Sequence, residues 1–293
     1  MDQPDPLGAQ VRAQYENDCA TFKERTQSLG IHDLDFYHWY HTVDLGDGII
    51  TPGIYDYRSA IHQFPFPQDM SGLSLLEVGS ATGFFAFEAE RRGAQVTSVE
   101  LPSLHSLDRF PGQTQALTLR KLVHMRSGGA DAPTDPLIAL GSAQTYFYHL
   151  DGPFQFCYRR LNSKLSRVYS SIYDLDKTDI AASSFDYVLL GDVLLHLINP
   201  MQALAVAAKY ARKYLIISQQ LSTIPSDKPL IEYVGGSDPE KDDISWLHPN
   251  FHFFDQFCRK LGFAHVEEVG RNQGYLRPTG SPYDRPILLA SRA

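Results

Sequence analysis

Apolar residues are distributed along this 293-residue chain in two recurring patterns. Short consecutive apolar runs predict buried strands, and apolar residues at helical spacing predict the helices between them. Strands are predicted at residues 75–78, 95–100, 167–174, 185–191, 214–219, 264–269 and 286–291. Helices are predicted at residues 84–92, 153–164, 201–212 and 251–261. This alternation is typical of a mainly parallel sheet covered by helices on both faces.

The connection between the last two predicted strands differs from the others. Residues 272–283 contain glycine and proline turn markers but no helical pattern. A hairpin is therefore expected there, which makes the last strand antiparallel. The predicted fold class is α/β and Rossmann-like, with a mostly parallel seven-stranded sheet and an antiparallel last strand.

The first 70 residues have a different texture and are predicted to form an N-terminal helix and lid. Residues 9–29 show helical apolar spacing, and Gly30 stands where a C-cap is expected. The aromatic run from Phe36 to His41 leads into turn-forming residues up to Tyr57, which predicts an ordered loop. The Rossmann-like domain is then residues 71–293, with an insertion at about 101–152.

Composition narrows the expected partners and location. The formal net charge of −8 weighs against a surface that neutralises many phosphates, so a small-molecule partner is favoured over nucleic acid. Three widely spaced cysteines and the lack of a long apolar run favour a cytoplasmic protein without a membrane span. The sequence leaves open whether the chain forms a homodimer. No metal site is expected, because His248 and His252 have no third ligand at suitable spacing.

The turn after the first predicted strand carries the most informative chemistry. It contains a Glu-x-Gly-x-Ala-x-Gly pattern, in which the predicted cofactor contacts are Glu77, Gly79, Ser80, Ala81 and Gly83. Glycines there allow a tight turn and close backbone approach to a ligand. A carboxylate two residues before the first glycine would repel a pyrophosphate but attract an ammonium, and the spacing departs from the dinucleotide pattern. The motif therefore predicts S-adenosylmethionine as methyl donor.

The ends of the later strands supply further candidates. Glu100, followed by Leu101, ends the second strand where a carboxylate can accept both ribose hydroxyls. Tyr173 and Asp174 end the third predicted strand, where Asp174 would accept a hydrogen bond from the adenine amino group and Tyr173 or Leu175 would flank the ring. Solvated strand-end residues are the alternative for both strands.

The fourth strand leads into the predicted catalytic residues. Gly191 is expected to contact the donor, and Asp192 to edge the transfer centre. His196 lies four residues beyond Asp192, which predicts one shared helical face and a general base that deprotonates the acceptor. The alternative is a packed or helix-capping histidine.

Several motifs occur together between residues 36 and 220: Trp39-Tyr40-His41, Thr51-Pro52-Gly53, Leu76-Glu77-Val78-Gly79, Tyr173-Asp174-Leu175 and Leu194-Leu195-His196-Leu197. Together they resemble the methyltransferases related to the tRNA wobble-uridine carboxymethyl-transferring enzyme. The resemblance implies a class I methyltransferase fold, S-adenosylmethionine or a carboxylated relative as donor, and an N-terminal segment folded over the cofactor. The acidic chain and the insertion favour the small-molecule branch and ordinary S-adenosylmethionine.

The N-terminal aromatic residues gain candidate roles from this resemblance. Rings near a sulfonium gain cation–π attraction, which makes Trp39 a cofactor candidate, Tyr40 a substrate contact and His41 a second catalytic candidate. Packing of the N-terminal helix is their alternative role. Further substrate candidates, with loop anchoring as the alternative, are Glu232, Tyr233 and Trp246.

The leading expectation is methyl transfer to an O or N nucleophile of a small molecule. The alternatives are an RNA methyl- or carboxymethyltransferase and a non-catalytic S-adenosylmethionine-binding protein.

Overall fold

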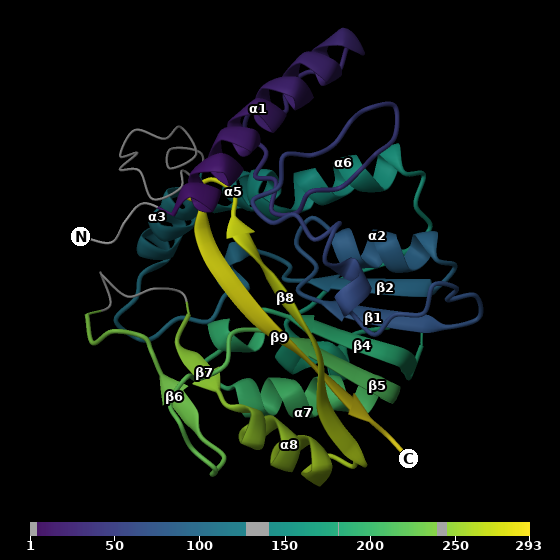
Figure 1. The fold of residues 1–293 in the computed structure, drawn as a ribbon, viewed down its shortest axis with the longest axis vertical. Coiled ribbons are helices and arrows are strands. Elements are labelled where there is room, and N and C mark those ends of the chain that lie inside the picture. Colours follow the sequence, from purple (N-terminus) through teal and green to yellow (C-terminus); the bar gives the residue numbers. More distant parts are fainter. Residues whose placement is uncertain (1–4, 127–140, 181, 239–244) are drawn as a thin grey trace.

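A seven-stranded sheet lies at the centre of the computed structural model, which describes residues 5–126, 141–180, 182–238 and 245–293 (Figure 1). The strand order is β3-β2-β1-β4-β5-β9-β8. The first five strands pair in parallel, whereas β9 is antiparallel to both β5 and β8. The predicted fold class is therefore confirmed. The strands are β1 (Ser74–Val78), β2 (Gln95–Glu100), β3 (Ser166–Tyr169), β4 (Phe185–Gly191), β5 (Ala211–Ser218), β8 (His265–Leu276) and β9 (Ser281–Ser291).

The order of the strands creates a crevice at the carboxyl end of β1. The chain runs from β1 outward to β2 and β3, then returns to the other side of β1 with β4 and β5. In open α/β sheets, ligands bind at the point where this order reverses. Glu77 is paired with Ser98 of β2 and with Leu189 of β4, so the carboxyl ends of these strands meet at one edge.

Helices cover both faces of the sheet, and successive strand residues point to opposite faces. Leu75 belongs to an apolar cluster with the side chains of α2 and α6, whereas Leu76 belongs to a second cluster with those of α7 and α8. Figure 1 shows these helix pairs on opposite sides of the strands. The helices are α1 (Pro6–Ser28), α2 (Phe84–Arg91), α3 (Gln115–Arg126), α5 (Gly141–Tyr146), α6 (Gly152–Arg160), α7 (Pro200–Tyr210) and α8 (Phe251–Lys260). Shorter helical turns lie at Ile61–Gln63, Leu104–Ser106, Phe147–Asp151, Ile172–Lys177 and Leu194–His196.

The N-terminal helix α1 packs against the tip of the β8–β9 hairpin (Figure 1). A Cβ atom on Gly8 would lie 2.3 Å from the carbonyl oxygen of Gly280, so the contact requires glycine. The helix ends near Gly30, whose φ of +69° matches the predicted C-cap. The predicted domain boundary at residue 70 stays a prediction.

Several predicted strand boundaries were wrong. β5 begins at Ala211 rather than at residue 214, because α7 ends at Tyr210. β3 ends at Tyr169 rather than at Asp174, because the Ser171 side chain accepts a hydrogen bond from the amide of Tyr173 and begins a 3₁₀ helix. The predicted loop at 272–283 is largely strand, since β8 continues to Leu276.

Some features lie outside the sequence predictions. A second sheet, formed by β6 (Ile231–Tyr233) and β7 (Leu247–Pro249), lacked an apolar run that could have indicated it. Within the predicted insertion, residues 127–140 lie outside the described part of the chain. Among the described helices, none combines the length and apolar character needed to cross a membrane.

Candidate active site

A cavity of about 230 Å³ opens at the carboxyl ends of β1, β2 and β4. Its walls come from the turn after β1, from the ends of β2 and β4, and from the N-terminal segment around residue 40. This is the crevice that the strand order predicts. The candidate site residues that line it are Tyr40, His41, Glu77, Gly79, Ala81, Glu100, Leu101, Tyr173, Gly191, Asp192 and His196.

The turn after β1 brings main chain directly against the cavity. Gly79 has a φ of +74°, and a Cβ atom there would lie 2.6 Å from the Val193 side chain. Ala81 also adopts a left-handed conformation, with a φ of +47°. Such backbone is costly for a residue with a side chain and is concentrated at functional sites.

Glu100 is fixed at the end of β2 by main-chain donors. Its carboxylate accepts hydrogen bonds from the amide of Ala81 at 2.8 Å and from its neighbour Leu101 at 3.0 Å. The side chain is buried and lines the cavity. Because a carboxylate has four lone pairs, this arrangement leaves capacity to accept two ligand hydroxyls.

Glu77 is the least satisfied charged group of the site. Its side chain is only 3% exposed, and its Oε2 atom has no hydrogen-bond partner. Burial raises the pKa of Glu77 to about 8, against the lowering effects of the Arg167 charge and the Ala86 amide. A buried carboxylate without a partner fits a cationic group on a ligand.

The two predicted catalytic residues after β4 do not share a helix. Asp192 has a φ of +48°, and only Leu194–His196 form a 3₁₀ turn, so the predicted helical face was wrong. The Asp192 carboxylate instead accepts hydrogen bonds from Nε of Arg285 at 2.9 and 3.0 Å. Asp192 and His196 both line the cavity, but the Asp192 carboxylate forms an ion pair with Arg285.

His41 is buried against the first turn of α2. Its amide donates to the Thr82 hydroxyl at 2.7 Å, and its Nδ1 atom accepts from the Phe84 amide at 3.5 Å. Burial lowers the pKa of His41 to about 3. A neutral imidazole that accepts at Nδ1 carries its proton at Nε2.

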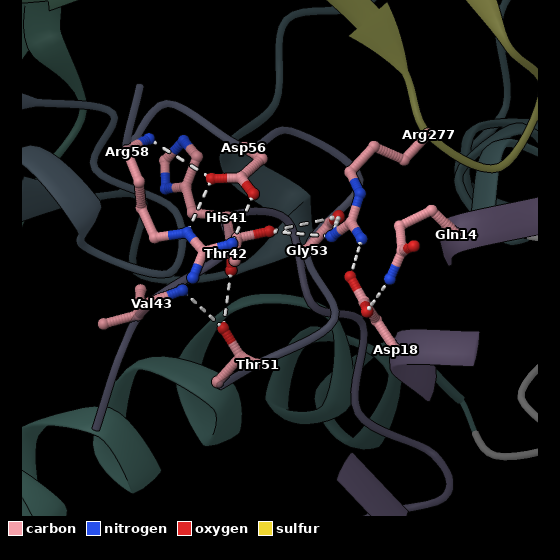
Figure 2. A network of polar contacts seen from close by, with 10 residues as sticks. All are labelled: Gln14, Asp18, His41, Thr42, Val43, Thr51, Gly53, Asp56, Arg58 and Arg277. Atoms are coloured by element: carbon pink, nitrogen blue, oxygen red, sulfur yellow. Dashed lines mark hydrogen bonds and ion pairs between the residues drawn. The ribbon is translucent and has the colours of Figure 1, made fainter. Parts of the chain in front are cut away.

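The Thr-Pro-Gly motif holds His41 in place (Figure 2). The Thr51 hydroxyl donates to the carbonyl of His41 at 2.9 Å and accepts from the Val43 amide at 2.7 Å. A Cβ atom on Gly53 would lie 2.0 Å from the carbonyl carbon of His41. The Arg277 guanidinium donates to the Gly53 carbonyl at 3.2 Å and also contacts Asp18 of α1. The motif therefore links the cavity wall to α1 and to the hairpin tip.

Trp39 and Asp174 lie outside the cavity lining. Trp39 is buried in the core, with its ring centroid 5.2 Å from that of Phe22. Asp174 is exposed on its 3₁₀ helix and is paired with Lys177 at 2.6 Å. The positions of Trp39 and Asp174 therefore do not support direct contact of either residue with the methyl donor.

Ser80 and Gly83 support the turn from behind. The Ser80 hydroxyl is buried 2.7 Å from that of Ser98, and Ser80 is not among the described residues that line the cavity. Gly83 is the N-cap of α2, with a φ of +88°, where Phe154 leaves no room for a side chain. Both act on the shape of the turn.

The predicted substrate residues beyond β5 are also outside the lining. Glu232 accepts a hydrogen bond from the Ser222 hydroxyl at 2.6 Å, and Tyr233 is 53% exposed. Trp246 is buried, with its ring 5.0 Å from that of Phe110. These side chains fit the loop-anchoring alternative.

The structure adds lining residues that the sequence did not single out. Asn272 of β8 is 2% exposed, and its side-chain oxygen has no hydrogen-bond partner. Tyr57 is buried, which raises the pKa of its hydroxyl well above the usual range. His38 and His149 stack with ring centroids 4.3 Å apart. The aromatic run and the adjacent turn residues were the local signal for His38 and Tyr57, whereas Asn272 fell in a predicted loop and His149 in the predicted insertion.

Asp108 is a further lining residue that the sequence did not indicate. Its carboxylate accepts a hydrogen bond from the Tyr173 hydroxyl at 2.6 Å and one from the Ile198 amide at 2.7 Å. Burial, with the hydrogen bond to Asp108 as a second cause, raises the pKa of Tyr173. Asp108 thus ties the segment after β2 to the loop after β4.

Neither a protein-family model nor a curated protein sequence matches the chain. Among solved structures, it is similar to the N-terminal domain of EvdMO1 in the presence of SAH and D-fucose, with 12% identity, 88% and 93% of the two chains covered, and a TM-score of 0.49. A second is the Burkholderia thailandensis 1,6-didemethyltoxoflavin-N1-methyltransferase, with 12% identity, 100% and 93% covered, and a TM-score of 0.43. A third is magnesium protoporphyrin IX methyltransferase from Synechocystis PCC 6803 with bound SAM, with 14% identity, 76% and 72% covered, and a TM-score of 0.39. Similarity at these values carries no argument about activity, so the chemistry has to follow from the site.

Proposed function

We propose that this chain transfers a methyl group from S-adenosylmethionine to an O or N nucleophile of a small molecule. The observation that carries the proposal is Glu77, a buried carboxylate without a partner for Oε2 at the strand end that leads into the glycine turn. An ammonium group would satisfy this atom, whereas a pyrophosphate would be repelled by it.

The remaining donor-side residues fit the same cofactor. Glu100 has two fixed hydrogen bonds and further capacity for the ribose hydroxyls. Leu101 and Tyr173 also line the cavity, and their apolar surfaces fit the adenine. When bound, S-adenosylmethionine supplies an electrophilic methyl group on a sulfonium, and the protein has mainly to hold the acceptor in line.

The acceptor half of the cavity contains neutral hydrogen-bonding groups. Burial raises the pKa of Tyr40 and of Tyr57, so both hydroxyls stay protonated. Asn272 offers an amide oxygen without a partner. We assign His196 as the group that receives the acceptor proton, because it lines the cavity beside the loop after β4.

A small acceptor is favoured over RNA. Four carboxylates and neither lysine nor arginine occur among the described lining residues: Glu77, Glu100, Asp108 and Asp192 are the acidic ones. Phosphate contacts depend on lysine and arginine, so this lining disfavours a nucleic-acid backbone. It equally disfavours a carboxylated donor, whose additional negative charge would face these carboxylates.

Calorimetry tests the donor assignment. S-adenosylhomocysteine, the demethylated product, is expected to bind one site per chain with micromolar affinity, and NAD is not expected to bind. Binding of NAD without S-adenosylhomocysteine would refute the proposal. The acceptor role of His196 requires that His196→Gln bind S-adenosylhomocysteine as the wild type does and lose turnover with an identified acceptor.

A further inference from the structure

The contacts of His41 indicate which nitrogen of its imidazole ring carries the proton. The ring lines the cavity and accepts a hydrogen bond at Nδ1 from the Phe84 amide at 3.5 Å, while Thr82 and Thr51 fix the main-chain amide and carbonyl of His41. Because Nδ1 is the accepting nitrogen, the cavity-facing capacity of the ring is a donor at Nε2. The positive end of α2 beside it also disfavours an imidazolium.

Glu77 and His41 converge on the same turn of helix. Phe84 donates to His41, and the Ala86 amide faces the Glu77 carboxylate and lowers its pKa. These two amides belong to the first turn of α2, which begins at Phe84. A ligand group held by Glu77 is therefore within the neighbourhood of His41.

The amino-acid end of the donor carries two opposite charges on one carbon atom. If Glu77 holds the ammonium, the α-carboxylate must lie close to it and must be received by hydrogen-bond donors. Because the described lining residues include neither lysine nor arginine, neutral N–H and O–H groups have to fill this role. His41 is such a donor, and it is next to the turn that Glu77 faces.

We propose that His41 binds the α-carboxylate of the methyl donor as a neutral Nε2–H donor, rather than acting as a base on the acceptor. This inference rests on the proposed function. It assigns His41 to donor binding and leaves His196 as the group for the acceptor proton. The Thr-Pro-Gly motif then has a defined purpose, because it fixes the main chain directly after this donor, at the carbonyl of His41.

A pair of ligands isolates the carboxylate. S-adenosylhomocysteine carries it, whereas S-adenosyl-3-thiopropylamine retains the ammonium and lacks the carboxylate. In His41→Leu, we expect affinity for S-adenosylhomocysteine to fall about 10- to 100-fold, as for a lost hydrogen bond to a charged group, and affinity for the thiopropylamine to change less than about twofold. His41→Gln, which keeps an N–H donor, should recover most of the lost affinity.

Nitrogen-15 NMR of histidine side chains gives a second measurement that needs no stable variant. The His41 signal is assigned through the main chain, or by its absence from the spectrum of His41→Gln. In the wild type at pH 7, it should show an unprotonated Nδ1 and a protonated Nε2. The Nε2–H resonance should move on addition of S-adenosylhomocysteine and stay in place with the thiopropylamine. An imidazolium, the opposite tautomer, or a shift of equal size with both ligands would overturn the proposal.

The outcomes separate this inference from the proposed function. Equal losses for both ligands in His41→Leu would show a purely structural role, and unchanged affinity for S-adenosylhomocysteine would show no role in donor binding. Either result would overturn the inference while leaving the donor assignment intact. A wild type that binds neither ligand would overturn both.

Discussion

The unpartnered carboxylate of Glu77 should lower the free energy of unfolding of the ligand-free protein in a defined pH range. Its pKa is about 8 in the folded chain and 4.5 as the ordinary value, so the native state binds more protons than the unfolded state between these values. Stability therefore falls as pH rises from about 4.5 and the full cost is reached above about 8. Converted at about 1.4 kcal/mol per tenfold change in proton affinity, the cost is roughly 5 kcal/mol. Glu77→Gln removes it.

Urea unfolding at pH 5 and at pH 8.5 measures this cost. The advantage of Glu77→Gln over the wild type should grow by several kcal/mol between the two values, whereas Glu267→Gln, on an exposed part of β8, should show no such growth. An advantage that is the same at both pH values would refute the argument that Glu77 is buried without sufficient compensation.

The same titration has a consequence for binding. At pH 7 about nine-tenths of Glu77 is protonated, given a pKa of about 8. An ammonium group requires the carboxylate, so S-adenosylhomocysteine should release close to one proton on binding. Calorimetry in phosphate and in Tris buffers detects this as a difference in apparent enthalpy. A wild type that binds tightly without proton release would contradict the ammonium assignment, and Glu77→Gln should bind weakly with no release.

Three other predictions concern Glu100, Asp192 and Gly53, whose contacts fix the shape of the site. Glu100→Gln should weaken S-adenosylhomocysteine binding about 100-fold by calorimetry, because charge-assisted hydrogen bonds are lost, whereas the exposed Asp174→Asn should bind as the wild type does. Asp192→Asn leaves the partly buried Arg285 guanidinium without its counter-charge and should cost about 3 kcal/mol in urea unfolding; a cost below about 1 kcal/mol would argue that solvent screens the pair. Gly53→Ala should cost about 3 kcal/mol or more, because its Cβ would lie 2.0 Å from main chain, and Gly236→Ala, whose nearest atom is 3.9 Å away, is the matched control. Equal stability of these two variants would exclude the close approach at Gly53.

Two of the parallel strands could be predicted closely from the sequence, whereas β3 and β5 could not. β4 (Phe185–Gly191) has the predicted bounds because a strand buried on both faces produces a largely apolar run with sharp ends. β2 (Gln95–Glu100) also has the predicted bounds, although only two of its residues are apolar. Glu77 and Glu100 could be placed at the crevice for the same reason, since each stands at or near a strand end. Their common location then followed from the parallel arrangement.

The acceptor side could not be predicted in the same way. Asp192 and Arg285 are 93 residues apart, and their ion pair depends on the path of the β8–β9 hairpin. Asn272 fell in a predicted loop because its neighbours have turn-forming composition, although pairing with Arg285 makes the segment a strand.

On the donor side, the position of Asp174 was predicted wrongly. The Ser171 side chain bonds to the local main chain and favours a 3₁₀ helix over a continued strand.

Backbone conformation links these two sides. Ala81 and Asp192 both adopt left-handed conformations without being glycine, one after β1 and the other after β4. Each is held by its own amide, which donates to the Glu100 carboxylate in the first case and to the carbonyl of Ser218 in the second. A cost of about 1–3 kcal/mol at each position persists only when the surroundings fix it. Since both residues line the one cavity where the strand order reverses, this strain favours a site shaped in advance for its ligands over a scaffold that merely retains the fold.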